Sequence, residues 1–249
     1  MGHLHYRVRD VDANARFWVA LGGTAVSIGS NQAVKLRDVF VVLTQGDYSG
    51  ASEGAVVNHV AFRVPSFDGL EKTGIKIARL EGFPGVGNTN TPEGERVELF
   101  EDAALNLTFT PDEGKHSSGS DRHNKPVGAP IAFHHIHLYL PGEEHLAAKA
   151  WYVRMFGAVA GKRSNYDAAD LPGINLNFSG DRAGGAMKGR TLDHIGFEIT
   201  GLESFCKRLE SMGVTFGTPY RRNADGIATA TLMDPWGTII ELTEGLRRF

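Results

Sequence analysis

Histidine recurs at the same place in four short apolar segments of this 249-residue chain. The segments read HLHYRV, VNHVAFRV, FHHIHLYL and LDHIGFEI, and their shared histidines are His3, His59, His135 and His194. Two acidic side chains recur as well, Glu98 in TPEGERVELFE and Glu241 in DPWGTIIELTE. Two imidazoles and one carboxylate on one side of a divalent metal ion leave other coordination positions open for a substrate. The pattern therefore predicts metal sites of the two-histidine, one-glutamate type.

The strand that contains Glu241 shows how the carboxylate reaches such a site. Asp-Pro-Trp-Gly is a turn signal, so residues 238–243 are predicted to form a strand that leaves a tight turn. Ile240 and Leu242 then face the core, and Glu241 faces the opposite side. A carboxylate that faces a cavity is costly unless it is paired or bound to a metal.

An internal repeat decides how we group these residues. Residues 58–84 align without a gap on residues 193–219, so that His59 falls on His194. A repeat of this length indicates duplicated structural units. We predict an N-terminal domain at 1–112, a polar linker at 113–130 and a C-terminal domain at 131–249.

Each predicted domain divides into two modules of similar order. Every module opens with a histidine-bearing strand, continues into a helical segment and ends in two or three further strands. The helix of the second module is expected to be weak, because Gly69 and Gly74 interrupt it. The order predicts an α+β protein with antiparallel sheets that curl around a cavity.

Grouping by contiguous domain gives one primary and one secondary metal site. The primary site is predicted to consist of His135, His194 and Glu241, and the secondary site of His3, His59 and Glu98. The segment between Pro84 and Pro92 is short, so the first domain is expected to lack a strand next to its glutamate. We therefore expect the secondary site to be the degenerate one.

The order of modules resembles the vicinal oxygen chelate superfamily in its two-domain tandem form, a group that includes glyoxalases, bleomycin-resistance proteins and extradiol dioxygenases. The matching features are the strand histidine with alternating apolar residues after it, the closing DPWGTIIEL, and an aromatic pair before glycine at Phe17-Trp18 and Trp151-Tyr152. The resemblance covers nearly the whole chain apart from the linker. It implies four βαβββ modules paired into two cupped, barrel-like antiparallel β domains with flanking helices.

The opening strands of the first and third modules contain a second histidine, so the register of the ligand has to be chosen. In the resembling families the ligand precedes apolar residues at the third and fifth following positions, which His3 and His135 satisfy. His137 then becomes a candidate base within reach of the substrate. His5 is expected to line the substrate cavity.

The resemblance implies one divalent metal ion per active domain, Fe2+, Zn2+, Mn2+ or Ni2+, and a small-molecule substrate with two adjacent oxygens. A glyoxalase-like lyase or isomerase is our leading interpretation, although the fourth ligand of such enzymes is missing. An Fe(II) extradiol-type ring-cleaving dioxygenase fits three ligands better, and a metal-free small-molecule-binding protein of the resistance type is a third interpretation. Besides His5, the side chains expected to contact the substrate are Asn177, Tyr220, Arg222, Thr229 and Thr231.

The composition is that of an ordinary globular protein. A net charge of −3 gives no basic surface for nucleic acid or an anionic membrane. No apolar run approaches the roughly 18 residues that a membrane span requires. The single Cys206 excludes an internal disulfide. We expect a cytoplasmic monomer or homodimer, although an exported protein whose signal peptide has been removed would have the same sequence.

Overall fold

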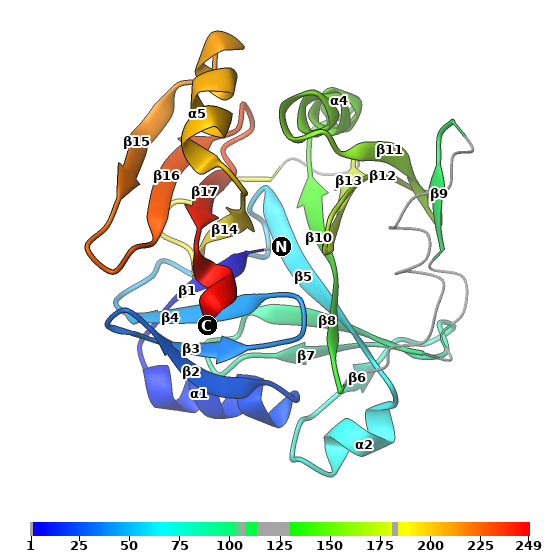
Figure 1. Cartoon of the computed structure of the whole chain (residues 1–249). Helices are drawn as coiled ribbons and strands as arrows, with labels where there is room; N and C mark the ends of the chain where they lie inside the picture. The colour runs from blue at the N-terminus through cyan, green and yellow to red at the C-terminus, as the bar shows by residue number, and fades with distance from the viewer. Residues whose placement is uncertain (1, 103, 105–107, 114–129, 181–183) are drawn as a thin grey trace.

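The computed structural model of the chain describes residues 2–102, 104, 108–113, 130–180 and 184–249. The predicted linker at 113–130 lies almost wholly outside these residues. The described chain is an α+β fold of two mixed sheets, with helices on the outside (Figure 1). The α+β class predicted from the sequence is confirmed, and among the described residues neither sheet closes into a barrel.

The first sheet has eight strands in the order β15-β16-β17-β14-β1-β4-β3-β2. The strands of the chain's beginning are β1 (His3–Val8), β2 (Thr24–Ile28), β3 (Asn31–Lys35) and β4 (Phe40–Gln45). Those of its end are β14 (Leu192–Glu198), β15 (Phe216–Arg222), β16 (Ala228–Met233) and β17 (Ile239–Glu244). The first and fourth modules therefore share one sheet, joined by the antiparallel pair β1–β14.

The second sheet has nine strands in the order β6-β7-β8-β5-β10-β13-β12-β11-β9. The second module supplies β5 (Val57–Val64), β6 (Ala78–Arg79), β7 (Val86–Asn90) and β8 (Arg96–Glu101), followed by β9 (Phe109–Pro111). The third module supplies β10 (Ala132–Tyr139), β11 (Val159–Arg163), β12 (Tyr166–Leu171) and β13 (Ile174–Ser179). Its central antiparallel pair is β5–β10.

The sheets therefore do not follow the predicted division into 1–112 and 131–249, because each half of the chain gives one module to each sheet. The reason is that all four modules open with a similar strand, and any two of these strands could form the central pair. One expectation about the first domain was wrong. The strand β7 does lie beside Glu98, since Asn88 pairs with it, and the shortened strand is β6.

Five short helical segments accompany the sheets in the described part of the chain. They are α1 (Val11–Ala20), α2 (Phe67–Glu71), α4 (Glu144–Phe156), α5 (Leu202–Ser211) and the 3-10 turn η1 (Leu246–Arg248). The Asp10 side chain accepts a hydrogen bond from the Ala13 N–H at the start of α1. As expected from its glycines, α2 has only five residues. None of the helices in the described part of the chain is long and apolar enough to cross a membrane.

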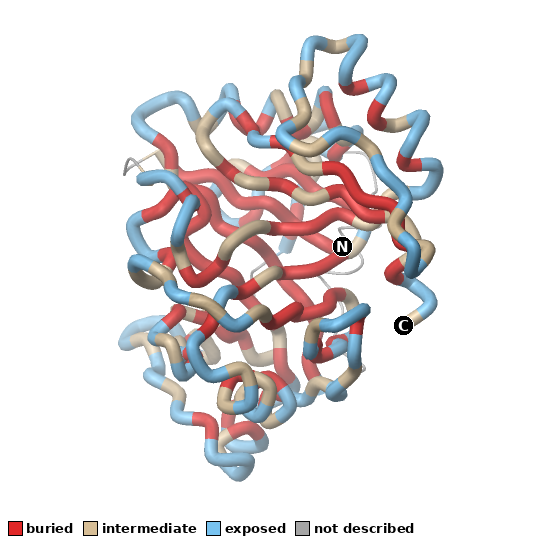
Figure 2. The backbone as a smooth tube through the Cα atoms, turned by 90° about the vertical axis from the view of Figure 1, so that its left-hand side faces the viewer, coloured by how far each residue is buried: buried red, intermediate tan, exposed pale blue. Residues whose placement is uncertain are grey.

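The larger of two hydrophobic clusters among the described residues runs through the strands of both sheets, and the helices cover it. Figure 2 shows buried strands through the middle of the molecule and exposed backbone at its periphery. Alternation along β1 places Leu4, Tyr6 and Val8 in this core, so His3 and His5 face the concave side of the sheet. The fold thus aims the histidines of each sheet into its own cup.

Candidate metal centres

Four side chains meet in the cup of the first sheet, and we call His3, His5, His194 and Glu241 the first cluster. The strand β1 lies between β14 and β4, so that His5 stands opposite His194. Glu241 comes from β17, the parallel neighbour of β14, where it pairs with Gly196. Residues from the two ends of the chain thus form a single site.

Three ligand atoms of the first cluster converge on one point. His3 Nε2 lies 3.2 Å from His194 Nε2 and 3.2 Å from Glu241 Oε2, and His194 Nε2 lies 3.5 Å from the same oxygen. Metal bonds of about 2.0–2.2 Å at angles of 90–110° place neighbouring ligand atoms about 2.8–3.6 Å apart. The spacing therefore fits a divalent ion between these three side chains.

The neighbouring Asp193 orients the His194 ring. His194 Nδ1 donates a hydrogen bond to Asp193 Oδ1 at 2.7 Å, which directs Nε2 toward His3 and Glu241. A carboxylate behind a histidine fixes the ring and raises its basicity as a metal ligand. Burial opposes a charge on His194, but its hydrogen bonds with Asp193 and Glu241 raise its pKa to about 9. The cluster thus attracts positive charge at the point where its ligand atoms meet.

Glu241 is ionised in this setting. Burial raises the pKa of the Glu241 carboxyl, but hydrogen bonds with His194 and His3 outweigh burial and hold the pKa well below its usual range. Burial lowers the pKa of His3, although Glu241 opposes the shift. The donor set is therefore a carboxylate with imidazoles, which suits Zn2+, Mn2+, Fe2+ or Ni2+.

A cavity of about 270 Å³ opens above the first cluster. His3, His5, His194 and Glu241 form part of its wall, with apolar side chains from Ile28, Val42, Ile227 and Leu246 and polar ones from Asn31, Asn223, Asp225, Thr229 and Thr243. Within it, the His5 ring is oriented by a 2.7 Å hydrogen bond between its Nε2 and Thr44 Oγ1. Burial, with the neighbouring imidazoles, lowers the pKa of His5 to about 3, so the ring is neutral at physiological pH.

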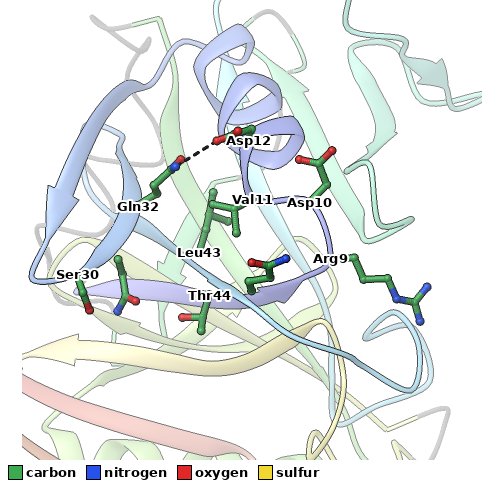
Figure 3. A pocket seen from close by; sticks show the side chains of 10 residues that line it. Arg9, Asp10, Val11, Asp12, Ser30, Gln32, Leu43 and Thr44 are labelled. Atoms are coloured by element: carbon green, nitrogen blue, oxygen red, sulfur yellow. Dashed lines mark hydrogen bonds between the residues drawn. The ribbon is translucent and has the colours of Figure 1, made fainter.

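A larger polar cavity of about 590 Å³ lies next to this one, beside the start of α1 (Figure 3). Gln32 donates a hydrogen bond to Asp12 across it. It shares Ser30 and Asn31 with the first cup but contains none of the clustered histidines or glutamates. Thr44, the hydrogen-bond partner of His5, is part of its wall.

The second sheet repeats the arrangement, and we call His59, His135, His137 and Glu98 the second cluster. Glu98 Oε2 lies 3.3 Å from His59 Nε2 and 3.5 Å from His135 Nε2. Asn58 stands behind His59 as Asp193 stands behind His194, with 2.9 Å from His59 Nδ1 to Asn58 Oδ1. His137 Nε2 contacts Ser179 Oγ at 2.7 Å, as His5 contacts Thr44. The two clusters are thus related position by position.

The second cluster differs in having two arginines. Arg163 Nη2 lies 3.1 Å from His135 Nδ1, and Arg96 Nη2 lies 3.4 Å from His59 Nε2. Burial raises the pKa of Glu98, but its hydrogen bond with His59 and the nearby arginines lower it overall. Burial and the Arg163 charge push the pKa of His135 far below its ordinary value.

The predicted grouping of ligands is corrected by this geometry. His135 belongs with Glu98 and His59, not with His194 and Glu241, and His3 takes its place beside them. His137, predicted as the base of the primary site, and Asn177 both lie in the second cup. The cause is the pairing of modules described above.

The other side chains that we expected to contact the substrate lie in three different places. His5 and Thr229 line the cavity of the first cluster. Thr231 stands opposite Glu241 on β16 but lines a different, apolar cavity. Tyr220 and Arg222 lie on the edge strand β15, outside the lining of the first cup, where Arg222 contacts Glu244.

Sequence reasoning missed four residues that shape the clusters: Asp193, Gly196, Arg96 and Arg163. Asp193 directly precedes the predicted ligand His194, which was an available signal. No signal in the sequence identified Gly196 or the two arginines, because their contacts depend on strands that are distant in the sequence.

No protein-family model matches the sequence, and no curated protein matches it. Solved structures share its fold. Glyoxalase I from Zea mays superimposes with a TM-score of 0.66 at 15% identity, covering 97% of this chain and 91% of the maize chain. A Bacillus subtilis protein, provisionally described as a dioxygenase, gives a TM-score of 0.64 at 14% identity, covering 97% of this chain and 84% of its own. The fold of this chain is therefore that of these two proteins.

Proposed function

We propose that the protein is a divalent-metal-dependent enzyme of the vicinal oxygen chelate type, in which His3, His194 and Glu241 hold the ion. The observation that supports this most is the convergence of their three ligand atoms within 3.5 Å of one another at the wall of a cavity. The orientation of His194 by Asp193 adds to it.

The small volume of the cavity sets the size of the substrate. About 270 Å³ accommodates a small organic molecule, and the apolar side chains of Ile28, Val42 and Ile227 suit a short hydrocarbon body. Asn31, Thr229 and Thr243 offer hydrogen bonds to its polar atoms. A bound divalent ion would act there as a Lewis acid toward two adjacent oxygens of the substrate.

We assign the proton-transferring role to His5 instead of His137. His5 lines the cavity, and Thr44 holds its ring in place. A neutral imidazole can accept a proton from a carbon next to a polarised carbonyl and return it. Together with the similarity to glyoxalase I, this favours a glyoxalase-like lyase or isomerase.

One observation favours a second candidate, an extradiol-type ring-cleaving dioxygenase with Fe2+. Val42 and Thr44 occupy the cup face of β4, so this strand offers no carboxylate or amide as a further ligand beside His3, His194 and Glu241. Three ligands leave more positions for a bidentate substrate and O₂.

Metal analysis of protein purified without chelator or metal-binding tag tests the proposal. We expect one equivalent of a divalent ion in the wild type, none in His194→Ala, and one in the matched variant His59→Ala. Zinc, nickel or manganese without catechol-dependent oxygen uptake supports the lyase or isomerase, and iron with such uptake supports the dioxygenase. A metal-free wild type whose ligand affinity is unchanged in His194→Ala would leave the resistance-type binding protein instead.

A further inference from the structure

The cups of the two sheets differ at two pairs of equivalent positions. In the first sheet β1, β4, β3 and β2 lie side by side, and in the second β10, β13, β12 and β11 do so in the same registers. His5 pairs with Val42, and its equivalent His137 pairs with Asn177. Two strands further on, Arg163 of β11 takes the position of Ile28 of β2. An apolar wall in the first cup is thus a guanidinium and an amide in the second.

Arg163 reaches from the far side of the sheet into the second cluster. Its Nε donates to Asn177 Oδ1 at 3.1 Å, and its Nη2 contacts His135 Nδ1 at 3.1 Å. The residue is only 2% exposed. Burial lowers the pKa of Arg163 to about 10, while the Glu98 charge opposes the shift, so the group is a cation at neutral pH.

This buried cation has one nearby carboxylate to balance it. A charge removed from water needs a partner of opposite sign, and Glu98 is the carboxylate that acts on Arg163 in the second cluster. In the first cluster the described residues place no arginine against Glu241, whose ion-pair partners within 4 Å are His3 and His194. The second cluster therefore already contains the positive charge that the first attracts.

Arg163 also sets the tautomer of His135. A guanidinium has only donors, so His135 Nδ1 accepts from Arg163 Nη2, and His134 Nδ1, 2.9 Å from the same nitrogen, can donate to it as well. The proton of the neutral ring is then on Nε2, the nitrogen that faces Glu98. A protonated nitrogen cannot bind a metal ion. His194 has the opposite arrangement, because Asp193 accepts from its Nδ1, so that Nε2 is the lone-pair nitrogen whenever the ring is neutral.

We propose that Arg163 replaces the metal ion in the second cluster and keeps His59, His135 and Glu98 free of metal, so that the chain binds a single ion. The second cluster is a latent metal site that opens when the guanidinium is removed. The ion at the first cluster rests on the proposed function, whereas the exclusion at the second cluster does not.

The test compares Arg163→Ile, which installs the residue of the first cup, with Arg163→Lys, which keeps a positive charge. Zn2+ and Mn2+ binding is measured by titration calorimetry and by metal content after gel filtration. We expect one equivalent in the wild type and in Arg163→Lys, and two in Arg163→Ile. In a His194→Ala background, which removes the first site, we expect no bound metal when position 163 is Arg or Lys. We expect one equivalent of metal when Arg163→Ile is added.

Two results would overturn the proposal. One is a metal ion in His194→Ala that is lost when His59→Ala is added, since the second cluster would then bind metal despite Arg163. The other is an Arg163→Ile protein with the circular dichroism spectrum of the wild type but no additional equivalent. Should Arg163→Ile not fold, Arg163→Met is scored in its place, and the His59→Ala comparison requires no change at Arg163. Failure of the proposed function appears separately, as a wild type without metal.

Discussion

The imidazole of His3 lies directly against the backbone of Gly196 on the neighbouring strand β14. A Cβ atom at position 196 would stand 2.2 Å from both Nδ1 and Cε1 of His3, far closer than any contact allows. Glycine at 196 is therefore a condition for the place of His3 beside Glu241. The equivalent strand of the second sheet has Ala61 at this point, opposite His135.

Gly196→Ala should displace His3 and weaken metal binding. We expect the affinity to fall on the order of 10- to 100-fold, as when other residues that position metal ligands are changed. Titration with Zn2+ or Mn2+ measures this. The control is Gly217→Ala, where a Cβ would meet Thr231 Oγ1 at an ordinary 3.6 Å, and its affinity should equal that of the wild type. Equal affinities in all three proteins would contradict the role assigned to His3.

Asp193→Ala should weaken metal binding without removing a ligand. The His194 ring loses the acceptor that holds its Nδ1 at 2.7 Å, so its orientation and basicity fall. A loss of about 10-fold or more in affinity is expected. Asp193→Asn, which copies Asn58 of the second cluster, keeps an acceptor and should lose less. If Asn were as damaging as Ala, the effect would come from charge and not from orientation.

His5→Gln should separate catalysis from metal binding. His5 is assigned to proton transfer and not to the ligand set, so the metal content should stay at one equivalent. Turnover of the substrate should fall by roughly 10²- to 10⁴-fold, the usual contribution of a positioned base. Thr44→Val removes only the hydrogen bond that orients His5 and should give a smaller loss. A loss of metal in His5→Gln would instead make His5 a ligand.

Glu95 gives the protein a pH-dependent stability that is independent of the metal site. The residue is 1% exposed, accepts a hydrogen bond from the Ser52 N–H, and has Arg190 and Glu53 nearby. Burial raises the pKa of Glu95 to about 7 from its ordinary value of 4.5. The folded protein therefore binds a proton between these pH values that the unfolded chain does not, and stability falls as pH rises through this window.

Glu95→Gln should remove this dependence. The variant should be more stable than the wild type at pH 8 by at most about 3 kcal/mol, the free energy that corresponds to the pKa shift. The difference should shrink as pH falls and vanish near pH 4.5. Urea unfolding of both proteins at pH 8, 6 and 4.5 measures it, and a difference that is constant with pH would exclude titration of Glu95 as its cause.

The sequence by itself determined the modules and their chemistry. Alternation of apolar residues placed His3 and His194 on one face of their strands, and the Asp-Pro-Trp-Gly turn did the same for Glu241. These are local properties, because a strand of period two has only two faces. The α+β class and the strand order within a module follow from the same patterns.

Only the tertiary structure decided which modules share a sheet. The four opening strands have similar patterns, so pairing β1 with β14 or with β5 satisfies the same local preferences, and the choice depends on packing across the whole core. That choice moved His135 to Glu98 and brought His3 to Glu241. It also placed Gly196 beneath His3 and Arg163 beside His135. These contacts join residues far apart in the chain, and local sequence patterns do not specify such contacts.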